Sequence, residues 1–189
     1  IVMAKDVTER TLAAEKVRKS EATMSHAQQI AHFGSWEMDI YNNEILGDNP
    51  INWSDEVFRI FGYKPGEIKV TTSLFLKSIH PDDLESVKRS LRDTIDKNEV
   101  YSIEHRIIIP TGEIKWIKGE AELLLDEKTN KISKIIGTVL DITERKKAEQ
   151  ETKINNERFE LVTKATNDAI WDWNLLTNEF FWSEGYEKL

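Results

Sequence analysis

The sequence predicts an α+β module, in which helices cover one face of a five-stranded antiparallel sheet, flanked by coiled-coil-like linker helices. Residues 99–143 contain three stretches in which apolar and polar side chains alternate, as in strands with one packed and one free face. Residues 33–53 carry two more strand-like stretches, and helix-starting and helix-breaking residues lie between the two groups. An internal repeat sets the boundaries of the module.

The repeat is the pattern Asp-x-Thr-Glu-Arg, which occurs at residues 6–10 and again at 141–145, an offset of 135 residues. The same offset places Trp36 on Trp171, and an offset of 129 places Trp53 on Trp182. We therefore expect an array of like modules. The division that follows is 1–10 as the last strand of a preceding module, 11–31 as a helical linker, 20–145 as one complete module, 144–165 as a second helical linker and 156–189 as the start of a following module.

Composition excludes several classes of function. Lys and Arg number 26 against 34 Asp and Glu, a formal net charge of −8, and the basic residues are dispersed, so we expect no nucleic-acid partner. The chain has no cysteine, which excludes disulfides, thiolate metal sites and cysteine-linked chromophores. No apolar run is long enough to span a bilayer and no signal peptide is visible. We expect a cytoplasmic piece, whose parent protein could still carry a membrane anchor.

The two linkers share a heptad-like pattern. Residues 9–31 contain no Gly or Pro and have small or apolar side chains at Ala13, Val17, Met24, Ala27 and Ala31, with Ser20 in the remaining position. The second linker has Ala148, Phe159, Val162 and Thr166 in matching positions. Either these helices pack on their own modules, or they form parallel coiled coils. We favour a homodimer formed through the linker helices.

The first half of the module alternates short strands and short helices. We predict strands at residues 33–40 and 51–53, a brief helix capped by Ser54, and a helical turn at residues 74–79. Pro81, followed by two acids, predicts the start of a longer helix. The buried stripe of that helix is Leu84, Val87, Leu91 and Ile95.

The second half reads as three strands, at residues 99–109, 113–126 and 131–143, with a hairpin turn at Pro110-Thr111-Gly112. On the first of them Tyr101, Ile103, His105 and Ile107 share one face. The last strand runs directly into the second linker. Thr143 is placed to cap that helix through its hydroxyl, and Asp141 and Arg145 are close enough in sequence to form an ion pair across the boundary.

These motifs resemble the PAS sensory family, in the version that ends with a PAC motif. The resemblance rests on motifs that span nearly the whole chain: Gly34-Ser35-Trp36-Glu37, Trp53-Ser54-Asp55-Glu56-Val57-Phe58-Arg59-Ile60-Phe61-Gly62-Tyr63, His80-Pro81-Asp82-Asp83, Glu104-His105-Arg106, Gly112-Glu113-Ile114-Lys115-Trp116-Ile117 and Gly137-Thr138-Val139-Leu140-Asp141-Ile142-Thr143-Glu144-Arg145. The resemblance implies a sensor module in a tandem array, typical of multi-sensor histidine kinases of two-component systems and less often of diguanylate cyclases.

The resemblance also implies a role for the junction, with Asp141, Thr143 and Arg145 relaying a change in the sheet to the second linker helix. The chain carries no phosphoacceptor-histidine motif, no ATP-binding glycine box and no GGDEF sequence, so we expect no enzymatic activity from it. The alternative is a ligand-free module for dimerisation or protein interaction, with the outer face of the sheet as its contact surface. Polar residues on that face, such as Glu104, Arg106 and Lys118, weaken this alternative.

A ligand cavity, if the core is not simply filled, should lie between the long helix and the inner sheet face. Its expected lining is Trp36, Phe58, Phe75, Ile79, Leu84, Val87, Leu91, Ile103, His105, Ile107, Ile117 and Ala121. His105 is the one polar candidate, either as a core histidine or as a ligand-binding group, and Gly119 leaves room on the same face. Haem-binding relatives place their histidine on the long helix, which has none here, so the resemblance argues against haem. Noncovalent flavin stays open, and we predict no metal site.

Overall fold

A five-stranded antiparallel sheet forms the centre of the computed structural model, which describes residues 2–40, 47–97, 100–129, 131–166 and 171–182. The strand order is β2-β1-β5-β4-β3. The strands are β1 Phe33–Asp39, β2 Asn52–Trp53, β3 Tyr101–Ile108, β4 Ile114–Leu125 and β5 Ile132–Asp141. The chain divides into two compact units, residues 1–143 and 144–189.

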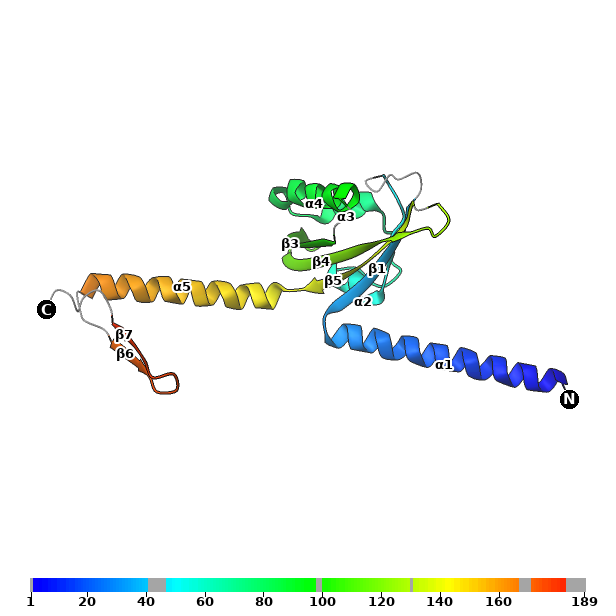
Figure 1. The fold of residues 1–189 in the computed structure, drawn as a ribbon, viewed down its shortest axis with the longest axis horizontal. Helices are drawn as coiled ribbons and strands as arrows, with labels where there is room; N and C mark the ends of the chain where they lie inside the picture. The colour runs from blue at the N-terminus through cyan, green and yellow to red at the C-terminus, as the bar shows by residue number, and fades with distance from the viewer. Residues whose placement is uncertain (1, 41–46, 98–99, 130, 167–170, 183–189) are drawn as a thin grey trace. The chain divides into compact units, whose positions relative to one another are not determined.

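Short helices connect the first two strands to the last three. They are α2 Asp55–Ile60, α3 Thr72–Ser78, the 3-10 turn η1 Pro81–Asp83 and α4 Leu84–Lys97. Helix α4 packs against β3, and Ile79, directly after α3, forms a β-bridge with Ile107 of β3 (Figure 1). The predicted α+β fold, with two strands, several helices and three strands in that order, is confirmed.

The core lies between these helices and the inner face of the sheet, and it has two parts. Around α2, the buried side chains are Val57, Ile60, Phe61, Ile107, Ile109, Ile117 and Val139. The second part contains Met38, Ile40, Tyr101, Ala121 and Ile135. Trp36 packs against both clusters, so it joins them across the sheet. Burial of this apolar surface is the main favourable contribution to the stability of the module.

Helix α2 sits directly on β1 because Gly34 has no side chain. A Cβ atom at Gly34 would lie 2.4 Å from a methyl carbon of Val57 and 2.8 Å from its backbone nitrogen. Ser54, which precedes α2, does not cap it as predicted. Its Oγ instead accepts a hydrogen bond from the Ser35 backbone N–H at 3.0 Å, and its own N–H donates to the Ser35 carbonyl at 2.9 Å. The serine therefore fastens the start of α2 to β1.

Residues 2–30 form one continuous helix, α1 Val2–Ile30, which corrects the strand predicted for residues 1–10. A strand needs neighbours that bond its backbone groups, and neither sheet in the described residues includes this segment. Its assignment to a preceding module stays a prediction. Of the predicted seam of α1, Ser20, Met24 and Ala27 are exposed. Gln28, near the end of α1, is buried and donates to Ser35 Oγ at 3.0 Å.

The second unit contains most of helix α5 Thr143–Thr166 and a hairpin of β6 Trp171–Asn174 and β7 Glu179–Trp182. In the hairpin Trp171 pairs with Trp182, and in the central module Trp36 pairs with Trp53. These are the pairs that the two repeat offsets match. Residues 167–170 and 183–189 of the proposed following module lie outside the described residues. That the hairpin begins a further module stays a prediction.

Candidate functional site

A cavity of about 50 Å³ lies between the inner face of the sheet and helices α3 and α4. Five of the residues predicted to line it do so: Trp36, Phe75, Leu91, His105 and Ile117. The lining also includes nine residues absent from the predicted set: Met38, Ile51, Trp53, Phe61, Thr72, Tyr101, Gly119, Ile135 and Val139. The cavity is therefore displaced toward β1 and β5 from the position that the sequence suggested.

Seven predicted lining residues do not reach the cavity. Phe58, Ile79, Val87, Ile107 and Ala121 are buried in the surrounding core, and Leu84 and Ile103 are half-buried. Ile79 forms a β-bridge with Ile107 at the end of α3, which uses both residues to close the core. These positions have the parity of inward-facing residues, but parity does not specify which inward side chains border empty space.

Two polar side chains in the cavity wall have no hydrogen-bond partner among the residues that the structure describes. They are Tyr101, whose side chain carries its hydroxyl inward, and His105, which is unpaired at both Nδ1 and Nε2. Tyr101 is 3% exposed and His105 is 1% exposed, so water on the surface does not reach them. A buried polar group without a partner costs free energy, and such groups in native proteins commonly mark a functional site or a bound water.

Burial also holds both groups in their neutral forms. Desolvation lowers the pKa of His105 to about 4, against the smaller opposing effects of the Asp83 carboxylate and of a polar contact with the Ile103 backbone that falls short of hydrogen-bond geometry. Desolvation raises the pKa of the Tyr101 hydroxyl above its ordinary value. At neutral pH the imidazole therefore offers one N–H donor and one nitrogen acceptor, and the phenol offers one donor and an acceptor.

Gly119 on β4 leaves space beside this pair. It lies opposite Ile103 in the sheet, between the positions of Tyr101 and His105 on the neighbouring strand. A Cβ atom at Gly119 would lie 3.2 Å from Tyr101 Cε1, 3.8 Å from the Tyr101 hydroxyl oxygen and 3.9 Å from His105 Cε1. Any larger residue would fill the space that both polar side chains border.

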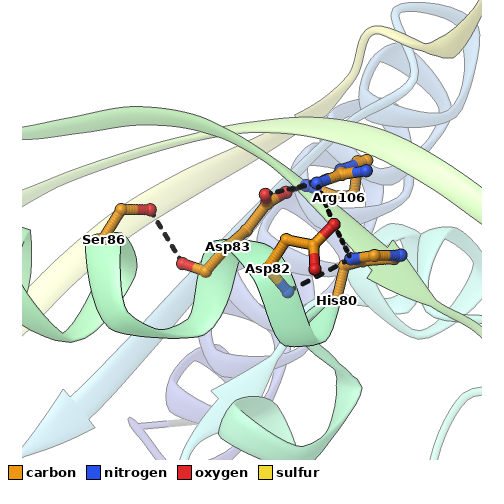
Figure 2. Close-up of polar contacts among 5 residues, drawn as sticks. All are labelled: His80, Asp82, Asp83, Ser86 and Arg106. Carbon is orange, nitrogen blue, oxygen red and sulfur yellow. Dashed lines mark hydrogen bonds and ion pairs between the residues drawn. The ribbon is translucent and has the colours of Figure 1, made fainter.

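On the other side of β3, a charged cluster joins the strand to the start of α4 (Figure 2). The Asp83 carboxylate accepts from the Arg106 backbone N–H at 2.8 Å, from Nε at 3.0 Å and from Nη2 at 2.7 Å. Arg106 Nη2 also donates to Asp82 at 3.3 Å, and His80 Nδ1 accepts from the Asp82 N–H at 3.3 Å. The hydrogen bonds of the Arg106 side chain, more than that of its backbone N–H, hold the pKa of Asp83 below its ordinary value. The His80 side chain thus caps the 3-10 turn η1, and the bonds between Arg106 and Asp83 tie the start of α4 to β3 beside His105.

The sheet is also hydrogen bonded to the first residue of α5. Thr143 Oγ1 accepts from the Trp116 backbone N–H on β4 at 3.0 Å and donates to Asp141 Oδ1 at 2.6 Å. The Ile142 N–H donates to the Trp116 carbonyl at 2.9 Å. Thr143 was predicted to cap the helix, but its hydroxyl bonds the sheet, and the Asp141 carboxylate instead accepts from the Thr143 N–H at 3.0 Å.

The charged residues of the junction have partners that the sequence did not indicate. Asp141 was predicted to pair with Arg145, and its Oδ2 lies 3.4 Å from Lys115 Nζ on β4. Arg145 pairs with Glu149, one turn along α5, at 2.9 Å. Lys115 and Trp116 directly precede Ile117, which lines the cavity. The wall of the cavity is therefore continuous, through two residues of β4, with the attachment point of α5.

The described residues offer neither a metal site nor a membrane span. Among them, no three His, Asp or Glu side chains come together as metal ligands would. Within the same part of the chain, no helix is both long and apolar enough to cross a membrane. The site consists of an apolar cavity, two neutral polar groups and two attachments of the sheet to helices.

Comparison with known proteins identifies the family. Residues 50–139 match the family described as PAS fold. A sensory box histidine kinase/response regulator of Burkholderia thailandensis superposes with a TM-score of 0.58 at 23% identity, over 72% of this chain and 96% of that chain. The N-terminal domain of a diguanylate cyclase with PAS/PAC sensor from Marinobacter aquaeolei gives 0.51 at 16% identity, over 60% and 97%. The central module is a PAS domain and belongs to this family.

Curated relatives of the chain are histidine kinases. A blue-light-activated histidine kinase of Brucella ovis is 31% identical over 140 residues, which are 74% of this chain and 26% of that protein. The protein of the same name in Brucella anthropi is 30% identical over 139 residues, with the same coverage. The chain thus spans about a quarter of the length of these relatives.

Proposed function

We propose that this PAS domain is a sensor and relay module of a larger signalling protein, and that this protein is a two-component histidine kinase. The observation that carries the proposal is the hydrogen bond that the Trp116 backbone N–H on β4 donates to the hydroxyl of Thr143, the first residue of α5. Because Trp116 precedes the cavity-lining Ile117, a shift of β4 caused by a bound ligand would move the start of α5. The histidine kinase relatives favour a kinase, rather than a diguanylate cyclase, as the output domain of the parent protein.

Two changes in the parent protein test the relay. Inserting one residue after Glu149 rotates everything beyond it by about 100°, whereas inserting seven residues restores the heptad register. We expect the single insertion to change autophosphorylation and the seven-residue insertion largely to preserve it. Equal effects of both insertions would contradict the relay.

A matched pair of threonines tests the attachment itself. Thr143→Val removes the hydroxyl that bonds β4, while Thr152→Val removes one that donates only to the Ala148 carbonyl within α5. We expect Thr143→Val to weaken the response of the parent kinase to its signal. Thr152→Val should leave that response unchanged, and a comparable loss in both variants would assign the effect to the helix rather than to the junction.

The cavity on the inner face of the sheet is too small for a large chromophore. Pockets for drug-sized ligands have volumes of roughly 300–1,000 Å³, and this cavity measures about 50 Å³. The chain also lacks a cysteine for a covalent adduct. The blue-light activation in the relatives' name is therefore not proposed for this module. We propose a small-molecule signal instead.

We propose that the module works as a homodimer through its linker helices. On α5, Phe159 and Val162 are exposed and lie at predicted seam positions. A second candidate is dimerisation through the outer sheet face, because that face exposes Ile114, Leu124, Ile136 and Leu140 among its polar residues.

Sedimentation of the 189-residue chain separates the two dimers. The double variant Phe159→Lys/Val162→Lys should dissociate a linker dimer, because it places charge in the apolar seam. The double variant Ile136→Lys/Leu140→Lys should dissociate only a dimer formed through the sheet. Dissociation by the sheet variant alone would favour the second candidate.

A further inference from the structure

The void beside Gly119 has the composition of a binding site for an uncharged molecule. Of the side chains that line it, Tyr101, His105, Thr72 and the indoles of Trp36 and Trp53 carry polar groups, and none of the lining residues is charged. The Thr72 hydroxyl is already engaged, since its Oγ1 lies 3.4 Å from Met38 Sδ and 3.4 Å from the Asn49 carbonyl. Among the lining residues, Tyr101 and His105 carry the buried polar atoms that have no partner in the described part of the chain.

The two unpaired groups border one point in space. The Tyr101 hydroxyl oxygen and His105 Cε1 lie 3.8 Å and 3.9 Å from the position where a Gly119 Cβ would be. A ligand oxygen in the cavity, at van der Waals distance from Gly119 Cα and beyond the missing Cβ, would face both side chains. A hydroxyl and a neutral imidazole can each donate to the same oxygen, which has two lone pairs to accept them.

We propose that this void binds a small neutral molecule through a carbonyl or hydroxyl oxygen, held jointly by the Tyr101 hydroxyl and the His105 imidazole. This inference rests on the sensory function proposed above and specifies the chemistry of its signal. Binding would give two buried polar groups the partners that the protein does not provide. The desolvation free energy that burial of these two groups costs on folding is offset by their hydrogen bonds to the ligand.

Charge excludes carboxylates and cations as the occupant. None of the lining residues is Lys, Arg, Asp or Glu, so an ion in the cavity would lose its hydration without gaining a charged partner. The Arg106 guanidinium is on the opposite side of β3 and is occupied by Asp82 and Asp83. Because burial lowers the pKa of His105 to about 4, the imidazole does not provide a positive charge at neutral pH.

Size sets the scale of the ligand. A dry protein cavity of roughly 150 Å³ accommodates benzene, so a cavity of about 50 Å³ has room for a molecule of only a few non-hydrogen atoms. Short alcohols, ketones, aldehydes and amides fall in this class. The competing occupant is water, since each water needs roughly 10–15 Å³ of such space and would also bond Tyr101 and His105.

An NMR titration of the isotopically labelled 189-residue chain tests the proposal. The probes are acetone, propan-2-ol and acetate, which have the same number of non-hydrogen atoms but differ in charge and in donor capacity. We expect saturable shifts at Tyr101, His105 and Gly119 with acetone or propan-2-ol, with a dissociation constant of about 1 mM or lower. Acetate should produce no saturable shift at these residues.

Three variants and a control link binding to the two polar groups. Tyr101→Phe and His105→Phe should each weaken binding by about 10-fold, the effect of one lost hydrogen bond. Gly119→Ala should abolish it by filling the void. Tyr63→Phe is the matched control, because Tyr63 is half-buried and does not line the cavity.

Either of two results would overturn the proposal. The first is the absence of saturable shifts with both neutral probes, which would leave only water in the cavity. The second is unchanged affinity in Tyr101→Phe. Neither result affects the relay, because the insertions after Glu149 are read out from the parent kinase without any added ligand. A negative titration together with a register-dependent output would reject the ligand and retain the relay.

Discussion

Two neighbouring residues of β3, His105 and Arg106, have opposite surroundings. His105 points into the core, is 1% exposed and has no hydrogen-bond partner at either ring nitrogen. Arg106 points to the other face, where its guanidinium bonds Asp82 and Asp83 and lies 5.6 Å from the centre of the Trp116 ring. One strand thus carries an unsatisfied polar group and a fully engaged one in consecutive positions.

This contrast distinguishes polar side chains that stabilise the fold from polar side chains that are available to a ligand. Polar groups that hold a fold together are normally satisfied, as at Asp83, because an unpaired buried group destabilises the folded state. Tyr101 and His105 depart from that rule together, on one face, beside a glycine. We therefore expect substitutions in the charged cluster to reduce stability, and removal of a polar atom from the cavity to increase it.

The largest expected effect is at Asp83. Asp83→Ala leaves the Arg106 N–H and guanidinium without their main acceptor and should lower the free energy of unfolding by about 3 kcal/mol, as measured by urea denaturation. Asp82→Ala is the control, since the Asp82 side chain is 70% exposed and accepts one longer bond, and its effect should stay within about 0.5 kcal/mol. Similar losses in both variants would contradict the assigned geometry.

The Asp83 contribution should also depend on pH. Arg106 lowers the pKa of Asp83 in the folded state, so the stabilisation is present above the ordinary aspartate pKa, about 4, and is lost as the pH falls below it. In Asp83→Ala this part of the acid destabilisation should disappear. The free energy of unfolding of both proteins, measured by urea denaturation between pH 5 and pH 2, tests this. An equal loss of stability on acidification in the variant and the parent chain would contradict the role of Asp83.

The next effect concerns His105 and has a different pH window. Burial lowers its folded pKa to about 4, below the ordinary value of 6.5, so the unfolded chain binds more protons between these two values. Stability is therefore full above about pH 6.5 and falls toward pH 4, with a loss of about 2 kcal/mol between pH 8 and pH 5. His105→Phe should remove this pH dependence. Its persistence in the variant would assign it to other groups.

The smallest effect has the opposite sign. Tyr101→Phe removes a buried hydroxyl that has no partner, and it should raise the free energy of unfolding by about 1 kcal/mol in the ligand-free chain. Tyr63→Phe should change stability by less than about 0.5 kcal/mol. If Tyr101→Phe destabilised the chain instead, the hydroxyl would have a partner, such as a structural water, and the comparison with Arg106 would fail.

Much of this architecture could be predicted from the sequence. Side-chain parity placed Tyr101 and His105 on one inward face, because successive residues of a strand alternate between the two faces. Helix-starting residues at His80–Asp83 located α4, and the repeat matched the four tryptophans that the structure shows paired in β1–β2 and in β6–β7. These features depend on neighbours a few residues apart, and local backbone geometry determines them.

Contacts between distant segments were decided by the tertiary structure alone. The partner of the Ser54 hydroxyl is 19 residues away on β1, and that of the Thr143 hydroxyl is 27 residues away on β4. Local sequence patterns predicted that each hydroxyl would accept from an N–H in the first turn of its helix. In the structure each hydroxyl accepts instead from the backbone N–H of a strand residue. The cavity could not be located from the sequence either, because its empty volume depends on how side chains from several strands and helices fill the core together.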